Sequence, residues 1–190
     1  MDDEKLLIER IKLGETELFA VLLDKYQDRL YAFVLRTVRN EDDAVDIVQE
    51  VFFKAYRSLS SYKARAKFST WLFRIGYNHA VDFIRKKNKR AAEKNIDSVT
   101  LSDERYHNRE LFAFKNFMDK MIAKLPRRYA AVLHLFYKEG KSYADIAGIT
   151  GQKLNTIKSD ILRGKNKLKE ILIDFENDNR YFNLKEVCNG

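Results

Sequence analysis

Residues 142–172 read SYADIAGITGQKLNTIKSDILRGKNKLKEIL, a short apolar segment, then a glycine, then a longer basic segment. The pattern predicts two helices that meet at a steep angle, because the small residue Ala147 lies four positions before Gly151 in the turn. Glycine adopts the positive φ that such a turn needs. We expect Asn155 to cap the second helix. One apolar stripe of this helix recurs at the helical period, namely Ile157, Ile161, Gly164, Leu168 and Leu172.

The opposite face of the second predicted helix carries polar side chains that suit DNA recognition. Amide, hydroxyl and guanidinium groups can read base edges, and the lysines beside them can bind phosphate. The predicted DNA-binding set is Lys153, Asn155, Thr156, Lys158, Ser159, Leu162, Arg163 and Lys165. The alternative is an ordinary helical hairpin with solvated charges, but only Asp160 and Glu170 offset the positive charge here. We therefore predict a helix-turn-helix whose second helix enters the major groove.

Composition predicts an all-α protein. The 190 residues include 7 Gly and 1 Pro, so few residues interrupt helices, and no hairpin-turn signal is present. The apolar periodicity fades near residue 92. We predict two small helical domains joined by a linker, with boundaries at 1–92, 93–108 for the linker, 109–174, and 175–190 for a tail. The acidic start is unlike a secretion signal, and no apolar run approaches the ~18 residues that span a bilayer, so we expect a cytoplasmic protein without membrane insertion.

Charge is distributed unevenly along the chain, whose formal net charge is +8. Residues 1–59 hold 9 basic and 13 acidic residues, residues 60–94 hold 10 and 2, and residues 126–172 hold 10 and 4. Two basic blocks behind an acidic one predict two contacts with a polyanion and one surface that serves a different partner.

The segment EDDAVDIVQEVFFKAYRSL, residues 41–59, predicts an amphipathic helix with an acidic outer face. A solvated acidic face is the commoner case, but a ring among carboxylates is also typical of a protein-binding hot spot. Because carboxylates repel DNA phosphates, this face predicts a protein partner. The predicted partner-binding set is Asp43, Asp46, Gln49, Glu50 and Phe53.

The segment YKARAKFSTWLFRIGYNHAVDFIRKKNKR, residues 62–90, interleaves aromatic residues with cations. Most of these rings should form core, but a basic loop before an aromatic helix also suits unstacked bases and their phosphates. The predicted set for a single-stranded or distorted nucleic acid is Lys63, Arg65, Lys67, Trp71, Asn78, Asp82, Arg85 and Lys86. The three histidines lack metal-site spacing, and no phosphate loop or catalytic triad is visible, so we expect no metal, cofactor or catalytic site.

Taken together, these motifs resemble the sigma-70 family of RNA polymerase sigma factors. DDAVDIVQEVFFKAY followed by FSTWLFRIGYNHAVDFIRK resembles region 2, and LPRRYAAVLHLFYKEGKSYADIAGITGQKLNTIKSDILRGKNKLKEIL resembles region 4. The two occur in this order on a chain of under 200 residues, which is the arrangement of the extracytoplasmic function (ECF) sigma factors. The resemblance implies a promoter-specificity subunit that catalyses nothing itself.

The resemblance also implies partners and roles for matching residues. The partners would be core RNA polymerase, through the β′ clamp helices and the β flap, promoter DNA and an anti-sigma factor. Asp46, Gln49, Glu50 and Phe52 would lie on the surface that binds the clamp helices. The loop 61–67 would capture a flipped base of the −10 element, the following helix would complete −10 recognition, and the helix from Asn155 would read the −35 element.

One departure from the family pattern concerns Asp160. The family has Gly-Thr-Val-Lys-Ser-Arg where this chain has Asn-Thr-Ile-Lys-Ser-Asp, so a phosphate-binding cation is replaced by a carboxylate. We expect Asp160 to lie near the DNA backbone and to limit affinity. Two rival functions remain, a nucleic-acid-processing enzyme with a helix-turn-helix appendage and a stand-alone DNA-binding regulator. Pull-down with core polymerase separates them from a sigma factor.

Overall fold

The computed structural model describes residues 3–94 and 111–178, and every regular element in these two ranges is helical. This confirms the all-α prediction. The linker predicted at 93–108 lies outside the described residues, apart from the last turn of α4. The helices are α1 (Asp3–Lys12), η1 (Thr16–Leu18), α2 (Phe19–Val38), α3 (Glu41–Ser58), η2 (Leu59–Ser61), α4 (Phe68–Lys94), α5 (Leu111–Ala123), α6 (Arg127–Leu133), η3 (His134–Lys138), α7 (Tyr143–Thr150) and α8 (Leu154–Asp178).

The N-terminal helical group, residues 3–94, is built around α2, α3 and α4, which all contact one another. Leu30 and Phe33 of α2 are fully buried. Helix α4 approaches α2 closely at Gly76, where a Cβ atom would lie 2.8 Å from Leu30 Cδ1. The Asn40 side chain accepts a hydrogen bond of 2.8 Å from the Asp43 backbone N–H, which caps α3 and fixes where that helix begins.

The C-terminal helical group, residues 111–178, contains the predicted corner. Helix α7 ends at Gly151, which has φ +70°, and Ser142 and Asp145 form a capping box at its start. The apolar stripe of α8 is buried at Ile157 and Ile161, as predicted. The expected cap by Asn155 is wrong: α8 begins at Leu154, and the Asn155 carbonyl already accepts a hydrogen bond of 2.9 Å from the Ser159 hydroxyl. The helix runs on to Asp178, past the expected domain end at 174.

The expectation that Asp160 faces DNA is also wrong. Its side chain is 0% exposed, and both carboxylate oxygens accept hydrogen bonds from the Arg128 guanidinium of α6. Next to this pair, Gly164 lets α8 approach α6, since a Cβ there would lie 3.1 Å from Leu133 Cδ1. Asp160 therefore holds α8 on α6 and does not lie on the exposed face of α8.

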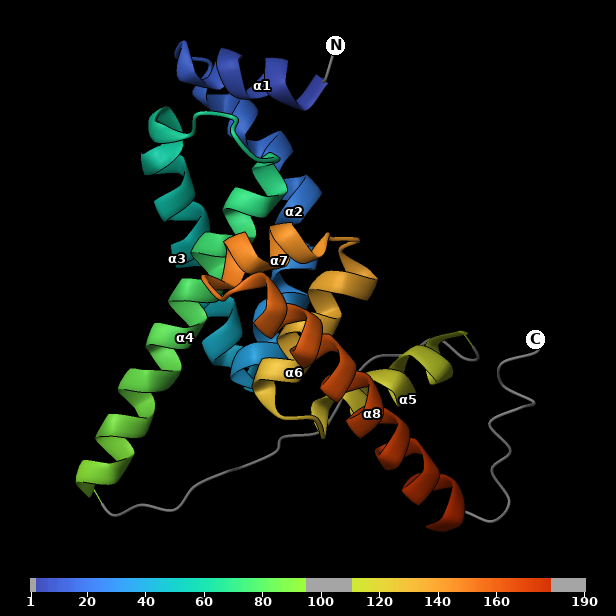
Figure 1. Ribbon diagram of the computed structural model, residues 1–190. Helices are drawn as coiled ribbons and strands as arrows, with labels where there is room; N and C mark the ends of the chain where they lie inside the picture. Colours follow the sequence, from blue (N-terminus) through green and yellow to red (C-terminus); the bar gives the residue numbers. More distant parts are fainter. Residues whose placement is uncertain (1–2, 95–110, 179–190) are drawn as a thin grey trace.

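The two helical groups pack against each other. Helix α7 lies against α4, and α6 lies against α2, as Figure 1 shows with the orange helix across the green one. The rings of Phe33 in α2 and His134 in η3 are 5.6 Å apart, and burial lowers the pKa of His134. Within the described ranges, no helix is both long enough and apolar enough to cross a membrane.

We predict that Asp160→Arg destabilises the protein by more than ~3 kcal/mol. The substitution places a buried cation beside Arg128 and removes the carboxylate with which Arg128 pairs. Duplex binding should fall with the folded fraction, although the substitution adds positive charge to the DNA-binding group. Denaturant unfolding with far-UV circular dichroism measures the change.

The matched control is Glu170→Arg, which changes the charge equally on a side chain that is 62% exposed. It should alter stability by no more than about 0.5 kcal/mol. Equal stabilities for the two variants would show that the buried pair does not hold α8 in place.

Candidate functional site

Helix α3 presents an acidic outer face with one exposed ring. Asp46, Gln49 and Glu50 are exposed, and Phe53 is 62% exposed. The neighbouring Phe52 is buried and packs edge-on against the Phe19 ring at 6.5 Å. The prediction that Phe53 lies on the outer face of α3 is thus confirmed. Phe52, which the resemblance places on the partner surface, belongs to the core.

The edge of this acidic face is tied to α4. The Asp43 carboxylate pairs with the Lys87 ammonium at 2.6 Å, and Glu50 lies 2.6 Å from His79 Nε2. Asp43 is half-buried and points toward α4, so it belongs to the α3–α4 contact more than to the outer face. The Arg57 guanidinium lies 5.4 Å from the centre of the Phe53 ring. A partner would therefore meet a ring flanked by both signs of charge.

The loop 61–67 has a defined shape that leaves its cations free. The Tyr62 hydroxyl donates to the Ala66 carbonyl at 2.6 Å, and Lys12 of α1 donates to the Tyr62 carbonyl at 2.8 Å. Ala64 adopts φ +53°, which turns the loop back on itself. Its three cations, all exposed, are Lys63, Arg65 and Lys67.

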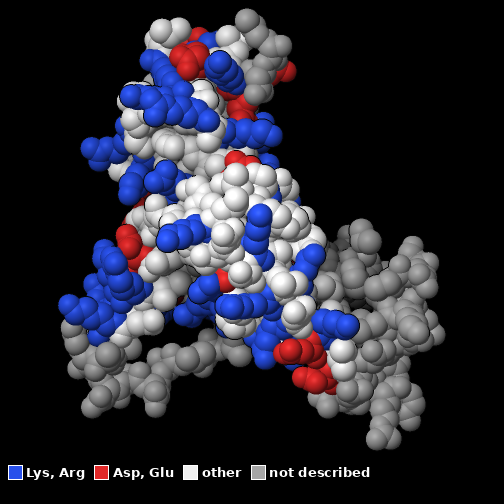
Figure 2. All heavy atoms as spheres, in the orientation of Figure 1, with Lys and Arg blue, Asp and Glu red and all other residues white. Residues whose placement is uncertain are grey.

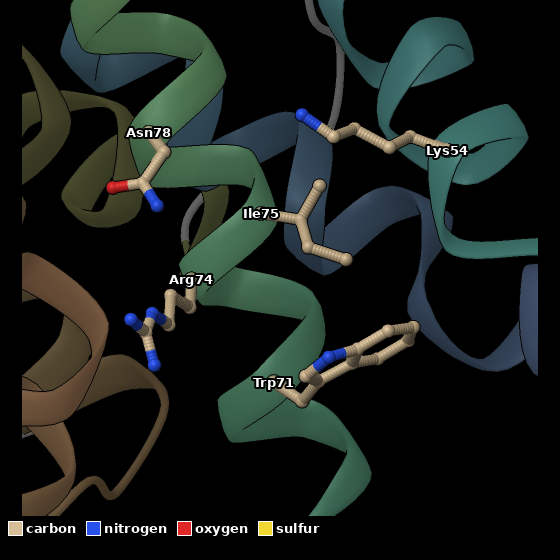
Figure 3. A pocket seen from close by; sticks show the side chains of 5 residues that line it. All are labelled: Lys54, Trp71, Arg74, Ile75 and Asn78. Atoms are coloured by element: carbon tan, nitrogen blue, oxygen red, sulfur yellow. The ribbon is translucent and has the colours of Figure 1, made fainter. Parts of the chain in front are cut away.

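Two hollows flank Trp71 at the start of α4. The first, about 200 Å³, is drawn in Figure 3, where Lys54 comes from α3 and the other four side chains come from α4. Its lining residues are Lys54, Trp71, Arg74, Ile75 and Asn78. The second, about 290 Å³, is lined by Ser61, Tyr62, Lys63, Arg65, Ala66, Thr70, Trp71, Arg74 and Gly148.

These hollows combine a flat indole with cations, which is what an unstacked base and its phosphates need. Arg74 lines both hollows and Lys54 lines one, and sequence reasoning missed both. Arg74 could have been found, because it lies three residues after Trp71 and so on the same side of the helix. Lys54 could not, because only the packing of α3 on α4 brings it there.

The remaining predicted −10 residues spread along α4. Asn78 lines the first hollow, but Asp82 and Arg85 pair with each other at 2.9 Å on the exposed surface. Lys86 is exposed farther along, about 12 Å from Asn78 at the helical rise. Figure 2 shows Lys and Arg gathered over this end of α4, and the hollow farther back along the helix is lined by other residues.

The outer face of α8 matches the predicted DNA-facing set. Leu162 is 60% exposed, Thr156 is half-buried, and Lys165 Nζ lies 5.4 Å from the centre of the Tyr137 ring. The exposed polar members are Lys153, Asn155, Lys158, Ser159, Arg163 and Lys165. The face therefore offers amide, hydroxyl and guanidinium groups beside cations, the mixture that reads base edges and binds phosphates.

Comparisons with known proteins match both helical groups. The Sigma-70 region 2 family matches residues 22–90, and the Sigma-70, region 4 family matches residues 118–168. The ECF RNA polymerase sigma factor SigW of Bacillus subtilis is 32% identical over 90% of this chain and 97% of its own length. The ECF RNA polymerase sigma-E factor of Haemophilus influenzae is 30% identical over 87% of this chain and 93% of its own.

Solved structures agree with the sequence relatives. The sigma factor RpoE of Bartonella quintana, in a co-crystal with the anti-sigma factor NepR, has a TM-score of 0.68 at 28% identity and covers 81% of this chain and 96% of its own. CnrH, in complex with the cytosolic domain of CnrY, shares the fold with a TM-score of 0.67 at 22% identity, covering 91% and 99%. The chain therefore belongs to the ECF sigma factors of the sigma-70 family, non-catalytic subunits of RNA polymerase that act in transcription initiation.

Proposed function

We propose that this sigma factor binds core RNA polymerase and two promoter elements through separate surfaces. Helix α3 binds core RNA polymerase at the β′ clamp helices, the loop 61–67 with α4 opens and holds the −10 element, and α8 reads the −35 element while the C-terminal group meets the β flap. The main support for this proposal is the acidic face of α3 with its exposed Phe53. DNA binding alone does not require such a face. The working place of such a subunit is the cytoplasm, where core polymerase acts.

The partner of α3 is a protein surface that offers cations and an apolar pocket. Carboxylates and Phe53 on one face supply charge complementarity at the rim and an aromatic anchor at the centre. A stand-alone DNA-binding regulator would gain nothing from this face. Pull-down of the chain with core polymerase therefore tests the proposal directly. Failure to bind core polymerase would favour the alternative hypothesis, a stand-alone DNA-binding regulator.

The role of Trp71 and its neighbours is to hold a base that has left the duplex. The hollows beside Trp71 are open to solvent and edged by Lys63, Arg65 and Arg74, which can hold the phosphates on either side of a flipped nucleotide. Asn78 can donate and accept hydrogen bonds at the Watson–Crick edge. Capture of such a base favours the open strand over the duplex, which assists melting.

An anti-sigma factor is the third proposed partner, after core polymerase and promoter DNA. The support is the Bartonella quintana relative, which is 28% identical and was solved in complex with one. Such a partner must compete for surfaces that polymerase or promoter DNA would otherwise occupy.

For the α3 face, we predict that Asp46→Ala with Phe53→Ala weakens core binding by at least ~2 kcal/mol, or about 30-fold, since it removes the anchor ring and a charge. Fluorescence titration of core polymerase with the labelled factor gives the affinity. The matched control is Leu13→Ala with Glu17→Ala, an exposed apolar residue and an exposed acid on another part of the surface. Equal affinities for the two double variants would remove α3 from the interface.

For the −10 site, we predict that Trp71→Ala weakens holoenzyme binding to a forked −10 template by ~1–3 kcal/mol, the usual contribution of one stacked base. Arg74→Ala should weaken the same binding through a lost phosphate contact. Trp71→Phe keeps a flat ring and should retain most of the affinity. Binding to duplex DNA that lacks the open strand should not change, and an equal loss on both templates would show that Trp71 acts only in folding.

For the −35 site, we predict that Arg163→Ala relaxes preference at one or two positions, because a guanine contact made by two hydrogen bonds contributes ~1–3 kcal/mol of discrimination. Lys158→Ala should weaken all sequences equally and make the salt dependence shallower by about one unit. Binding of holoenzyme to a library of −35 sequences at several salt concentrations separates the two. Identical profiles would mean that a different face of α8 enters the groove.

A further inference from the structure

The segment between α6 and α7 contains a turn of π-helix, η3 (His134–Lys138). The Glu139 backbone N–H donates to the His134 carbonyl, five residues before it, at 3.2 Å. A π-turn holds more residues than an α-turn, so it changes the direction of the side chains that follow, and such turns are frequent at functional sites. Here the turn carries two adjacent aromatic rings, Phe136 and Tyr137, to which the proposed function gives no role.

The two rings have different surroundings. Phe136 is half-buried and stacks on the Tyr143 ring of α7, with ring centres 5.2 Å apart and an angle of 6° between the planes. Tyr137 meets Phe136 edge-on, with ring centres 4.9 Å apart, and is 56% exposed. Because Phe136 supports one side of it, Tyr137 presents an exposed ring and hydroxyl at a low cost in conformational entropy.

Tyr137 lies beside a cation of α8. The Lys165 ammonium is 5.4 Å from the centre of the Tyr137 ring. The Tyr137 hydroxyl raises the pKa of Lys165, because it stabilises the charged ammonium. In the described part of the chain no carboxylate pairs with Lys165, and the next acid along α8, Glu170, pairs with Lys167 at 3.2 Å. The Lys165 charge is therefore available to an anion from outside the chain.

Lys165 lies on the side of α8 that we assign to phosphates. It follows Lys158 by seven residues, which is almost two full turns, so the two lysines point within about 20° of each other around the helix. A cation at the edge of a helix that enters the major groove can hold a backbone phosphate. Tyr137 extends this basic edge beyond α8, because its hydroxyl lies next to the Lys165 ammonium.

We propose that Tyr137 is a DNA-backbone contact, whose hydroxyl donates to the same phosphate of the −35 element that the Lys165 ammonium binds. The inference rests on the proposed −35 function of α8. A phenol hydroxyl has one hydrogen to donate and lone pairs that accept, so it can face an ammonium and a phosphate oxygen together. The neighbouring positive charge polarises the hydroxyl and strengthens the hydrogen bond that it donates. The contact carries no sequence information, because every nucleotide has a phosphate.

The hydroxyl is tested by Tyr137→Phe, which keeps the ring against Phe136. Holoenzyme with this variant should bind duplex promoter DNA about three- to tenfold more weakly, the effect of one hydrogen bond, for every −35 sequence tested. The salt dependence should not change, because a neutral hydroxyl releases no counterion, whereas Lys165→Ala should make it shallower by about one unit. Fluorescence anisotropy of labelled promoter DNA at several salt concentrations measures both quantities.

The matched control is Tyr56→Phe in α3. Tyr56 is 41% exposed and its ring meets Phe19 edge-on at 5.1 Å, so it copies the setting of Tyr137 far from α8 in the sequence. Promoter binding by holoenzyme with this variant should stay within about twofold of the parent. If Tyr137→Phe also binds as the parent does, or if the two variants weaken binding equally, the Tyr137 hydroxyl makes no DNA contact and the proposal is overturned.

The shared phosphate is located by neutral backbone substitution. A single methylphosphonate is placed at successive positions of the −35 element, and at one position the parent holoenzyme should lose affinity that Tyr137→Phe and Lys165→Ala have already lost. At this position both variants should therefore lose at least twofold less than the parent. The double variant should lose less than the two single losses combined, because the two groups share one partner. Insensitivity at two different positions, or strictly additive losses, would show that they do not share a phosphate.

The same measurements separate this inference from the proposed function. If Lys165→Ala and Arg163→Ala both leave promoter binding unchanged, α8 does not face the −35 element, and the proposed function fails together with the inference. If Lys165→Ala weakens binding while Tyr137→Phe does not, the −35 function of α8 stands and only the role of Tyr137 is overturned.

Discussion

The close crossing of α4 over α2 is the constraint on which the other contacts depend. Gly76 has no side chain of its own, so the Leu30 side chain of α2 packs directly on the α4 backbone, and Phe33 and Phe73 meet at 5.2 Å. Because α4 packs so closely on α2, three of its faces contact other helices. One packs on α2, one contacts α3 through the Lys87–Asp43 ion pair, and one lies under α7. Trp71 sits where these sides meet the loop, which is why the hollows form there.

Much of this arrangement could be predicted from the sequence, because period and turn chemistry are local. The helical period placed Phe53 on the outer face of α3, where it is exposed, and Gly151 marked the corner. The error at Asp160 came from applying a family contact to a position that lies about 60° around the helix from Ile157, at the edge of the apolar stripe of α8. An acid at that edge needs a buried partner, and only the fold shows that Arg128 supplies it.

Other parts of the site could not be predicted because they depend on which helices become neighbours. Lys54 reaches the Trp71 hollow from α3, and Gly148 reaches it from a helix more than seventy residues away. The start of α8 also escaped prediction, since the first turn is set by the geometry of the corner and Asn155 lies two positions after the capping position, Lys153. Periodicity determines the direction of a side chain around its own helix, but it does not determine which residues of other helices that side chain contacts.

The brace between α1 and the loop has a practical consequence for anyone who shortens this protein. The region 2 family match begins at residue 22, so a fragment cut to that limit discards α1. With it goes Lys12, whose ammonium holds the Tyr62 carbonyl and lies 5.6 Å from the centre of the Tyr62 ring. Glu4 is lost as well, and with it the acceptor of the Tyr26 hydroxyl hydrogen bond. Such a fragment would keep every residue assigned to the −10 strand while loosening the loop that presents them.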